Sequence, residues 1–243
     1  MDMKLKIPYE VAISCSNCKL INKCMPAGLS TFELSRIDSL VSQRIKIKRG
    51  NDLQRFSNSH QALYIIRTGY FKTVISTNDG RDQVLGFHMS GESIGLAGEI
   101  SNLYSCKVTA LEDSTVCIVP FAKVEEIANT VNGLHSHIRH LYSLEINREN
   151  SVMLFLGSMN SEERVATFLL KLSTSHEERG FSPLVLNLKM SRYDIASYLG
   201  LKHETVSRTL AKFIRNKLIN LKLRELRIIN LVALNSLAMD KQR

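Results

Sequence analysis

The stretch MSRYDIASYLGLKHETVSRTLAKFIRNKLI, residues 190–219, specifies the fold of the C-terminal part of this chain. Ser191 can cap a first helix, and Gly200 ends that helix after about two turns. A second helix follows, and the small Ala196 and the β-branched Val206 stand where two short helices would cross closely. The pattern predicts a helix-turn-helix.

The apolar positions of these two helices define their inner faces. Ile195 and Leu199 face inward on the first helix, and Leu210 and Phe213 on the second. The opposite face of the second helix is polar, which suits either solvent or the DNA major groove. Arginine can bond guanine, glutamate can accept from cytosine N4, serine can bond either, and lysine suits phosphate. We therefore predict binding to double-stranded DNA. The predicted contact residues are Lys202, His203, Glu204, Ser207 and Arg208.

The C-terminal third is also the basic part of the chain. Residues 161–243 carry fifteen Lys and Arg against eight Asp and Glu, whereas residues 1–160 carry seventeen against fifteen. Such a surface suits a polyanion, because Lys and Arg displace condensed counterions, although a merely soluble basic surface is the alternative. LINLKL and LRIIN predict a β-hairpin, or wing, after the second helix. Contacts with the DNA backbone are expected from Lys217, Lys222, Arg224 and Arg227.

The middle of the chain has a different periodicity. Residues 43–120 form a series of short β-branched or alternating runs separated by glycines, which predicts a compact all-β sandwich or barrel. Residues 30–40 predict a short helix before it, and helical spacing over 121–159 predicts a long helix after it. Residues 161–175 predict a further helix, capped by Ser161.

These patterns together predict an α+β chain with a domain boundary near residues 158–161. The expected parts are a cysteine-rich segment at 1–29, a β domain at 30–120, a long helix at 121–159 and a winged helix-turn-helix at 160–243. An apolar content of 44% over 243 residues supports ordinary hydrophobic cores.

The chain has neither a signal peptide at its start nor a run of 18 uncharged apolar residues, so we expect a soluble, cytoplasmic protein without a membrane partner. The histidines at 60, 88, 135, 137 and 140 show no acid–base or nucleophile spacing, so an enzyme is not expected.

The cysteines suggest a cofactor site. Cys15, Cys18 and Cys24 form a C-x2-C-x5-C run, while Cys106 and Cys117 lie far away. A reducing cytosol argues against structural disulfides, which leaves metal binding or redox chemistry. Three clustered thiols and a distant one can supply the four thiolates of a 4Fe-4S cluster. A tetrahedral zinc ion suits the same four thiolates, and unrelated thiols are the third possibility.

Several segments together resemble the FNR (fumarate and nitrate reduction regulator) subfamily of the CRP/FNR transcription regulators, over nearly the whole length. The matching segments are the helix-turn-helix, CSNCKLINKCMP, IIRTGYFKT, GFHMSGESIG, TALEDSTVCIVPF, NSEERVATFLLKLS and RGFSP. The resemblance implies a cyclic-nucleotide-binding-like β-roll, or jelly roll, then a long dimerisation helix and a winged helix-turn-helix.

The resemblance also implies a set of cluster ligands. It assigns a 4Fe-4S cluster to Cys15, Cys18, Cys24 and Cys117, with Cys117 preferred because its V-C-I-V-P context matches the distant ligand of the family. Cys106 then looks like a spare buried thiol. Lys19 and Lys23 depart from the apolar or small residues of the family, and a cation there could change the potential of the cluster and its access to oxygen.

For DNA, the resemblance implies that Glu204, Ser207 and Arg208 read palindromes with TTGAT-like half-sites. His203 departs from the family, where a small apolar residue is usual, so the outermost base preference is open. RNA polymerase is an implied partner through loops such as 78–82 and 179–183.

The resemblance implies a homodimer joined along the long helix, which suits half-sites about 34 Å apart. Ile146, Glu149 and Met153 fall on the matching face, and Glu149 would repel its counterpart unless the cluster is intact; a solvent-facing glutamate is the alternative. Oxygen would convert 4Fe-4S to 2Fe-2S and loosen the dimer.

Other signals are compatible with the same fold. Tyr104, Ser105 and Cys106 stand where cyclic-nucleotide receptors have an arginine followed by a serine and a small residue, so a cyclic nucleotide is not expected. A regulator with a zinc or thiol-redox signal, or with no cluster at all, remains the alternative to an oxygen sensor.

Overall fold

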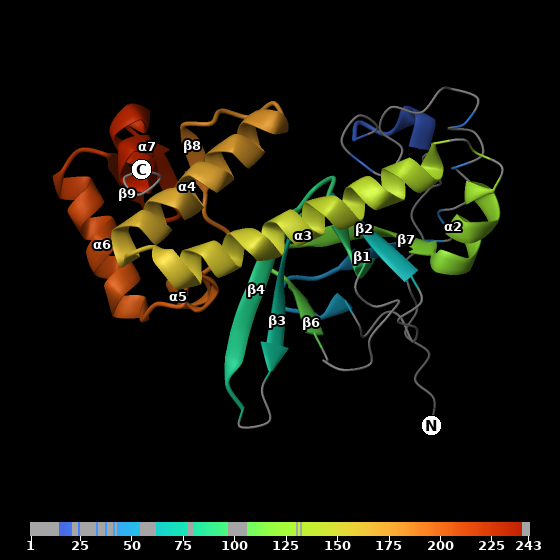
Figure 1. Ribbon diagram of the computed structural model, residues 1–243, viewed down its shortest axis with the longest axis horizontal. Helices are drawn as coiled ribbons and strands as arrows, with labels where there is room; N and C mark the ends of the chain where they lie inside the picture. The colour runs from blue at the N-terminus through green and yellow to red at the C-terminus, as the bar shows by residue number, and fades with distance from the viewer. Residues whose placement is uncertain are drawn as a thin grey trace. The chain divides into compact units, whose positions relative to one another are not determined.

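The protein is described by a computed structural model, drawn in Figure 1. It describes residues 15–20, 24, 33, 37, 41, 43–53, 62–76, 80–96, 106–129, 131 and 133–239. Packing divides the chain into two compact units, Met1–Asn147 and Arg148–Arg243. The packing boundary lies inside the long helix, between residues 147 and 148, whereas the sequence places the domain boundary near residues 158–161.

The N-terminal unit is built on two antiparallel sheets. One has the strand order β1-β7-β2-β5 and the other the order β4-β3-β6. The strands are β1 (Gln43–Ile47), β2 (Ala62–Thr68), β3 (Tyr70–Ser76), β4 (Asp82–Met89), β5 (Ser93–Ile94), β6 (Cys106–Ala110) and β7 (Ser114–Pro120). They coincide with the short runs in the sequence, which confirms the predicted β domain.

Alternation along the strands explains this unit. In β1, Ile45 and Ile47 are buried while Lys46 between them is exposed. They belong to one apolar core with side chains of both sheets, among them Phe71 and Val116. Gly69 turns the chain between β2 and β3 with a φ of 105°, and a Cβ there would come within 2.0 Å of the Ser114 Oγ, so only glycine fits.

A second apolar cluster supports the helices of this unit. Of the helix predicted at residues 30–40, only Glu33 and Ile37 lie within the described residues, and both are helical. Ile37 is fully buried in this cluster beside Leu63, Val119 and Leu134. The cluster thus joins the sheet, through β2 and β7, to the start of the long helix.

The single helix predicted over 121–159 is wrong in one respect, because the structure has two helices there. These are α2 (Phe121–Ala128) and α3 (Leu134–Ser158). Gly133 separates them with a φ of 103°, which lies outside the right-handed helical region. The last turns of α3 pack within the C-terminal unit, where Phe155 is buried and meets the ring of Tyr198 edge-on.

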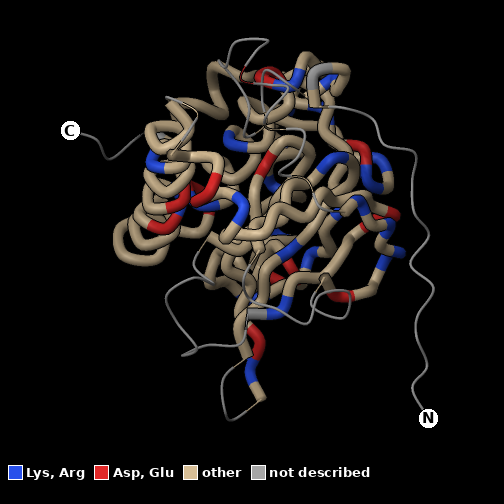
Figure 2. Tube along the Cα trace, turned by 90° about the vertical axis from the view of Figure 1, so that its right-hand side faces the viewer, with Lys and Arg blue, Asp and Glu red and all other residues tan. Residues whose placement is uncertain are grey.

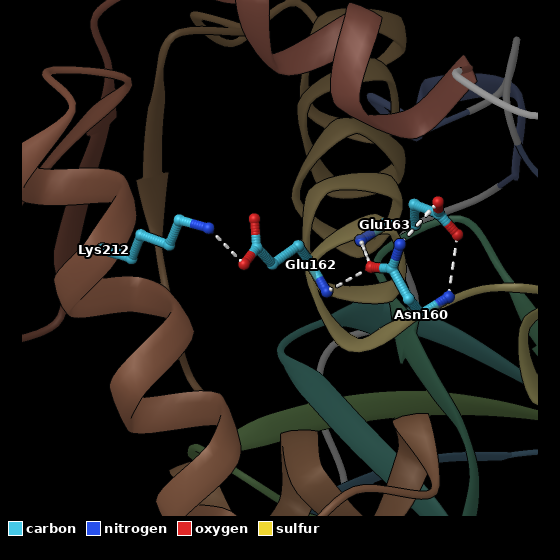
Figure 3. A network of polar contacts seen from close by, with 4 residues as sticks. All are labelled: Asn160, Glu162, Glu163 and Lys212. Carbon is cyan, nitrogen blue, oxygen red and sulfur yellow. Dashed lines mark hydrogen bonds and ion pairs between the residues drawn. The ribbon is translucent and has the colours of Figure 1, made fainter.

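The C-terminal unit begins with the end of α3 and continues with α4 (Ser161–Glu178). Asn160, not Ser161 as predicted, is the N-cap of α4. Its side chain accepts from the backbone of Glu162 and Glu163, and the Glu163 carboxylate accepts from the Asn160 backbone N–H at 2.7 Å (Figure 3). The sequence placed the cap one residue too late, at Ser161, because serine also caps helices.

The remaining elements form the predicted winged helix-turn-helix. A sheet with the order β8-β10-β9 flanks the two predicted helices, and α7 packs against α4. The elements are β8 (Val185–Asn187), α5 (Arg192–Leu199), α6 (His203–Arg215), β9 (Ile219–Lys222), β10 (Glu225–Ile228) and α7 (Leu231–Met239). The wing is confirmed, with β8 as a strand that the sequence did not predict.

Lys and Arg are interspersed with Asp and Glu along the traced chain (Figure 2). No helix within the described part of the chain is both long and apolar enough to cross a bilayer.

Candidate functional site

The first helix of the pair, α5, is held at both ends. At its start, Ser191 and Asp194 form a capping box, with the Asp194 carboxylate accepting from the Ser191 backbone N–H at 2.9 Å. At its end, Gly200 is left-handed with a φ of 60°, and the Leu201 N–H donates to the Ala196 carbonyl at 2.9 Å. This closure turns the chain sharply into α6.

The second helix, α6, has one buried and one exposed face, as predicted. Val206, Leu210 and Phe213 are at most 2% exposed, and Thr209 is also buried. Lys202, Glu204 and Arg208 are exposed, while His203 and Ser207 are half-exposed. All five predicted contact residues therefore lie at the N-terminal end of α6, away from its buried face.

Two basic side chains, Lys212 and Arg164, fix the helix pair to the rest of the unit. The Lys212 Nζ on α6 donates to the Glu162 Oε1 on α4 at 2.5 Å (Figure 3). Arg164 donates to the carbonyl of Leu199 at the end of α5 at 2.9 Å, and to those of Leu156 and Met159 at the end of α3 at 3.1 and 2.9 Å. The Arg164 guanidinium lies at the C-terminal ends of α3 and α5, where it interacts favourably with the partial negative charge of both helix dipoles.

The four residues on and beside the wing that were predicted to contact the DNA backbone have different surroundings. Arg227 pairs with Glu225 at 2.8 Å, and Arg224 donates to the Lys189 carbonyl at 3.2 Å. Lys217 and Lys222 are exposed, and Lys217 is left-handed with a φ of 53°. Arg227 is the least available of the predicted four, because its charge is already paired within β10.

Cys117 is central to the thiol site. It lies in β7, where its backbone pairs with Arg44 of β1 on one side and Ile65 of β2 on the other. Burial raises the pKa of the Cys117 thiol, while the charge and hydrogen bond of the Arg44 guanidinium lower that pKa. The Cys18 thiol acts on the same pKa by charge repulsion, so Cys18 and Cys117 are close in space although 99 residues separate them.

The other N-terminal cysteines lie nearby. Cys15 begins the 3-10 helix η1 (Cys15–Asn17). Cys24 packs with Cys117 against the apolar cluster around Ile37, and the Cys24 backbone hydrogen-bonds the His137 side chain of α3. Burial lowers the pKa of His137, and the neighbouring His140 lowers it further, whereas the bond to Cys24 raises it. The cysteine-bearing segment thus contacts both β7 and the first turn of α3.

The surroundings of the cysteines suit an anionic cluster. Cys15, Cys18, Cys24 and Cys117 are all half-buried thiols, and Arg44 supplies a cation beside one of them. Among the residues that the structure describes, no three cysteine, histidine or carboxylate side chains converge closely enough to hold a metal ion. The chemistry of the four thiols fits an anionic cluster.

Cys106 occupies a different place from Cys117. It is the first residue of β6, paired with Ile75 of β3, and belongs to the other sheet. Its side chain is not among the described ones. Tyr104 and Ser105, on which the expectation of no cyclic nucleotide depended, also lie outside the described residues, so that expectation stays a prediction.

The predicted dimer seam is an exposed apolar stripe on α3. Ile146 is 55% and Met153 is 63% exposed, and Glu149 between them is exposed too. Their spacing of three and four residues continues to Leu156, which is 45% exposed. Exposed apolar side chains at this spacing are typical of a helix that packs against another helix.

Sequence reasoning missed four residues of these sites: Arg44, His137, Arg164 and Tyr193. Arg44 becomes a partner of Cys117 only through the register of β1 and β7. Arg164 meets α5 across 35 residues of sequence. The ring of Tyr193 on α5 stacks on that of His203 on α6 with centroids 4.3 Å apart. A basic residue just after a capping box was the one local signal, at Arg164.

Comparison with known proteins gives the family. Residues 163–237 match the Crp-like helix-turn-helix domain, and residues 44–131 match the cyclic nucleotide-binding domain. The transcriptional regulatory protein btr of Bordetella pertussis is 37% identical over 97% of this chain and 98% of its own length. The fumarate and nitrate reduction regulatory protein of Vibrio cholerae is 34% identical over 93% of this chain and 91% of its own length.

Solved structures agree. FixK2 from Bradyrhizobium japonicum superimposes with a TM-score of 0.71 at 26% identity, covering 82% of this chain and 98% of that chain. A CRP-family transcriptional regulator of Thermus thermophilus, TTHB099, shares the fold with a TM-score of 0.62 at 20% identity, over 79% of this chain and 95% of that one. The chain therefore belongs to the CRP/FNR family of transcription regulators, is of the FNR-like type, and carries the DNA-binding helix-turn-helix of that family in α5 and α6.

Proposed function

We propose that this regulator senses oxygen through a 4Fe-4S cluster held by Cys15, Cys18, Cys24 and Cys117. With the cluster bound, the chain dimerises along α3 and binds palindromes with TTGAT-like half-sites. The observation that carries this proposal is the packing of Cys24 and Cys117 against the same apolar cluster, because it brings the N-terminal cysteine run to the distant fourth thiol.

The residues around Cys117 favour an anionic ligand set. Four thiolates around a cluster leave it negatively charged, and the Arg44 guanidinium lies against one of them. Arg67 of β2 also lowers the pKa of Cys117 by its charge. When bound, the cluster would supply an oxygen-labile link between the N-terminal segment and β7.

That link has a route to the dimer helix. Cys24 hydrogen-bonds His137 through its backbone, and both Cys24 and the first turns of α3 pack on the same apolar cluster. A change in the position of Cys24 would therefore alter the contacts at the start of α3. The same helix presents Ile146, Glu149 and Met153, where close approach of two protomers must overcome the repulsion between two Glu149 carboxylates.

At the DNA, each residue has a role that its chemistry supports. Glu204, Ser207 and Arg208 would read base edges, and Lys202 would bind phosphate. RNA polymerase would meet exposed loops, among which the loop 179–183 presents Phe181 with 65% of its surface exposed.

A zinc-bound or thiol-redox regulator uses the same thiols, and metal analysis separates it from the oxygen sensor. The full-length protein is purified without oxygen, its visible absorbance and its iron, sulfide and zinc contents are measured, and it is then exposed to air. Binding to a TTGAT-like palindrome is followed by fluorescence anisotropy in parallel, with Cys117→Ser as the variant and Cys106→Ser as its matched control.

The expected result is brown protein whose thiolate-to-iron absorbance bleaches in air as DNA binding falls, with loss of iron in Cys117→Ser but not in Cys106→Ser. Colourless protein that contains zinc or no metal, and that binds DNA equally with and without air, would contradict the cluster. Iron loss in Cys106→Ser alone would show that Cys106, and not Cys117, is the fourth ligand.

A further inference from the structure

An exposed aromatic stack lies at the end of α6 that carries the predicted base contacts. Tyr193, the second residue of α5, and His203, the first residue of α6, have ring centroids 4.3 Å apart and ring planes 29° apart. Tyr193 is 66% exposed, so its ring contributes little to the core. What the stack does provide is a side-chain contact between the first turns of the two helices.

Tyr193 stands on a well-fixed turn. The capping box at the start of α5 satisfies the backbone of both Ser191 and Asp194, whose side chains bond one another at 2.7 Å. A turn closed in both directions leaves the Tyr193 backbone little freedom. The backbone from which the Tyr193 ring projects is therefore fixed, and the ring itself stacks on His203.

The His203 ring stacks on the Tyr193 ring, and His203 also contacts Glu204. The His203 Nδ1 lies 3.3 Å from the Glu204 Oε2, while the Glu204 side chain stays 66% exposed. The N-cap of α6, Lys202, makes no side-chain capping bond. The Tyr193 stack is thus a side-chain constraint on the first turn of α6, and it acts on Glu204 through His203.

We infer that Tyr193 and His203 are positioning residues that orient the Glu204 carboxylate and thereby sharpen its choice of base. The inference rests on the proposed base-reading role of Glu204. An exposed glutamate samples several rotamers, and fixing one of them before binding removes the entropic cost of forming the contact with cytosine, so only a base that makes this contact gains affinity. The Glu204 Oε1 is the carboxylate oxygen that would then accept from the cytosine N4.

The test measures selectivity, not affinity alone. The full-length protein, purified without oxygen, is titrated with palindromes in which each position of the TTGAT half-site is replaced in turn by the other three bases. Selectivity is the ratio of the dissociation constants for the weakest and the tightest sequence at each position. The variants are Tyr193→Ala, Tyr193→Phe, His203→Ala and, as a control for a phosphate contact, Lys202→Ala.

We expect Tyr193→Ala and His203→Ala to lower selectivity at one position of the half-site by about three- to ten-fold. Tyr193→Phe keeps the ring and should retain the selectivity of the native protein. Lys202→Ala should weaken binding to every sequence by a similar factor. Melting temperatures of all variants check that the fold is intact, which the exposure of Tyr193 favours.

Two results would overturn the inference. One is a Tyr193→Ala profile that is parallel to the native one at all positions. The other is a Tyr193→Phe variant that loses as much selectivity as Tyr193→Ala, because the hydroxyl and not the ring would then matter. If the native protein itself prefers no half-site sequence, the proposed function fails instead.

Discussion

The Arg44 guanidinium opposes the effect of burial on the half-buried thiol of Cys117. Burial raises its pKa and Arg44 lowers it, so replacing Arg44 by Gln should raise the pKa further. The thiolate fraction at pH 8 then falls, and alkylation of Cys117 by iodoacetamide in the reduced, metal-free protein should slow by about two- to five-fold. Mass spectrometry of the peptide that contains Cys117 measures this rate.

Lys46→Gln is the matched control for that experiment. Lys46 carries the same charge two residues further along β1, on the same face of the strand, but is exposed. Its removal should leave the alkylation rate nearly unchanged. Equal slowing in both variants would mean that general electrostatics, and not the contact with Arg44, controls the thiol.

Gly200 is a second position where one residue decides local structure. An alanine at its φ of 60° is strained, and its Cβ would come within 2.5 Å of the Leu156 Cδ2. Gly180 also has a positive φ, 77°, but a Cβ added there meets nothing within 4 Å. We expect Gly200→Ala to lower the free energy of unfolding by about 2 kcal/mol and Gly180→Ala by about 1 kcal/mol.

Urea unfolding of the two variants measures that difference. Equal losses would show that the backbone strain alone matters and that the Leu156 side chain moves aside without cost. The outcome bears on how tightly the end of α3 packs against the turn of the helix pair.

Among the elements, the start of α4 depends on its cap. Asn160→Ala removes the acceptor of the Glu162 and Glu163 backbone N–H groups, and it removes one of the two donors that Asn160 gives to the Glu163 carboxylate, which is only 7% exposed. The free energy of unfolding should fall by about 1–2 kcal/mol. Ser161→Ala should change it by less than about 0.5 kcal/mol, because Ser161 is the first helical residue and not the cap.

Urea unfolding gives these values, with hydrogen exchange used to assign the transition to residues 148–243. A larger loss of unfolding free energy in Ser161→Ala than in Asn160→Ala would show that Ser161 is the cap, as expected from the sequence. The elements themselves were predictable: the periodicity of residues 43–120 and of 191–215 specifies strands and helices locally. The break at Gly133 was not predicted, although the glycine itself was visible in the sequence.

In the molecule as a whole, Glu149 should oppose dimerisation. Glu149→Ala removes one negative charge from each protomer at the seam, so the metal-free protein should dimerise about ten-fold more tightly, which corresponds to about 1.4 kcal/mol. Sedimentation equilibrium measures the dissociation constant of the dimer. DNA binding in air should rise in parallel, since two half-sites need two protomers.

Two control variants separate the seam charge from other effects of the substitution. Asn150→Ala makes a similar truncation at an exposed, uncharged position of α3 that lies about 100° around the helix from Glu149. Glu125→Ala removes an exposed negative charge from α2 instead. Neither should change the dissociation constant of the dimer by more than about two-fold.

Each other outcome has a distinct meaning. If Glu149→Ala dimerises as the native protein does, Glu149 faces solvent in the dimer and the seam lies elsewhere on α3. If Asn150→Ala tightens the dimer equally, the higher helix propensity of alanine explains the gain. If Glu125→Ala tightens it equally, the net charge of the protomer matters and the seam position is not special.

Local patterns in the sequence were sufficient to predict the helix-turn-helix, the β domain and the candidate DNA contacts, because capping signals and apolar periodicity act over a few residues. The choice of Cys117 as the fourth ligand came from the family resemblance instead. The partners that come from distant segments emerged only with the folded chain: Arg44 beside Cys117, Arg164 between two helix ends, and Tyr193 on His203. Strand register and helix crossing depend on how whole faces pack, and no local pattern encodes which side chain will stand opposite another.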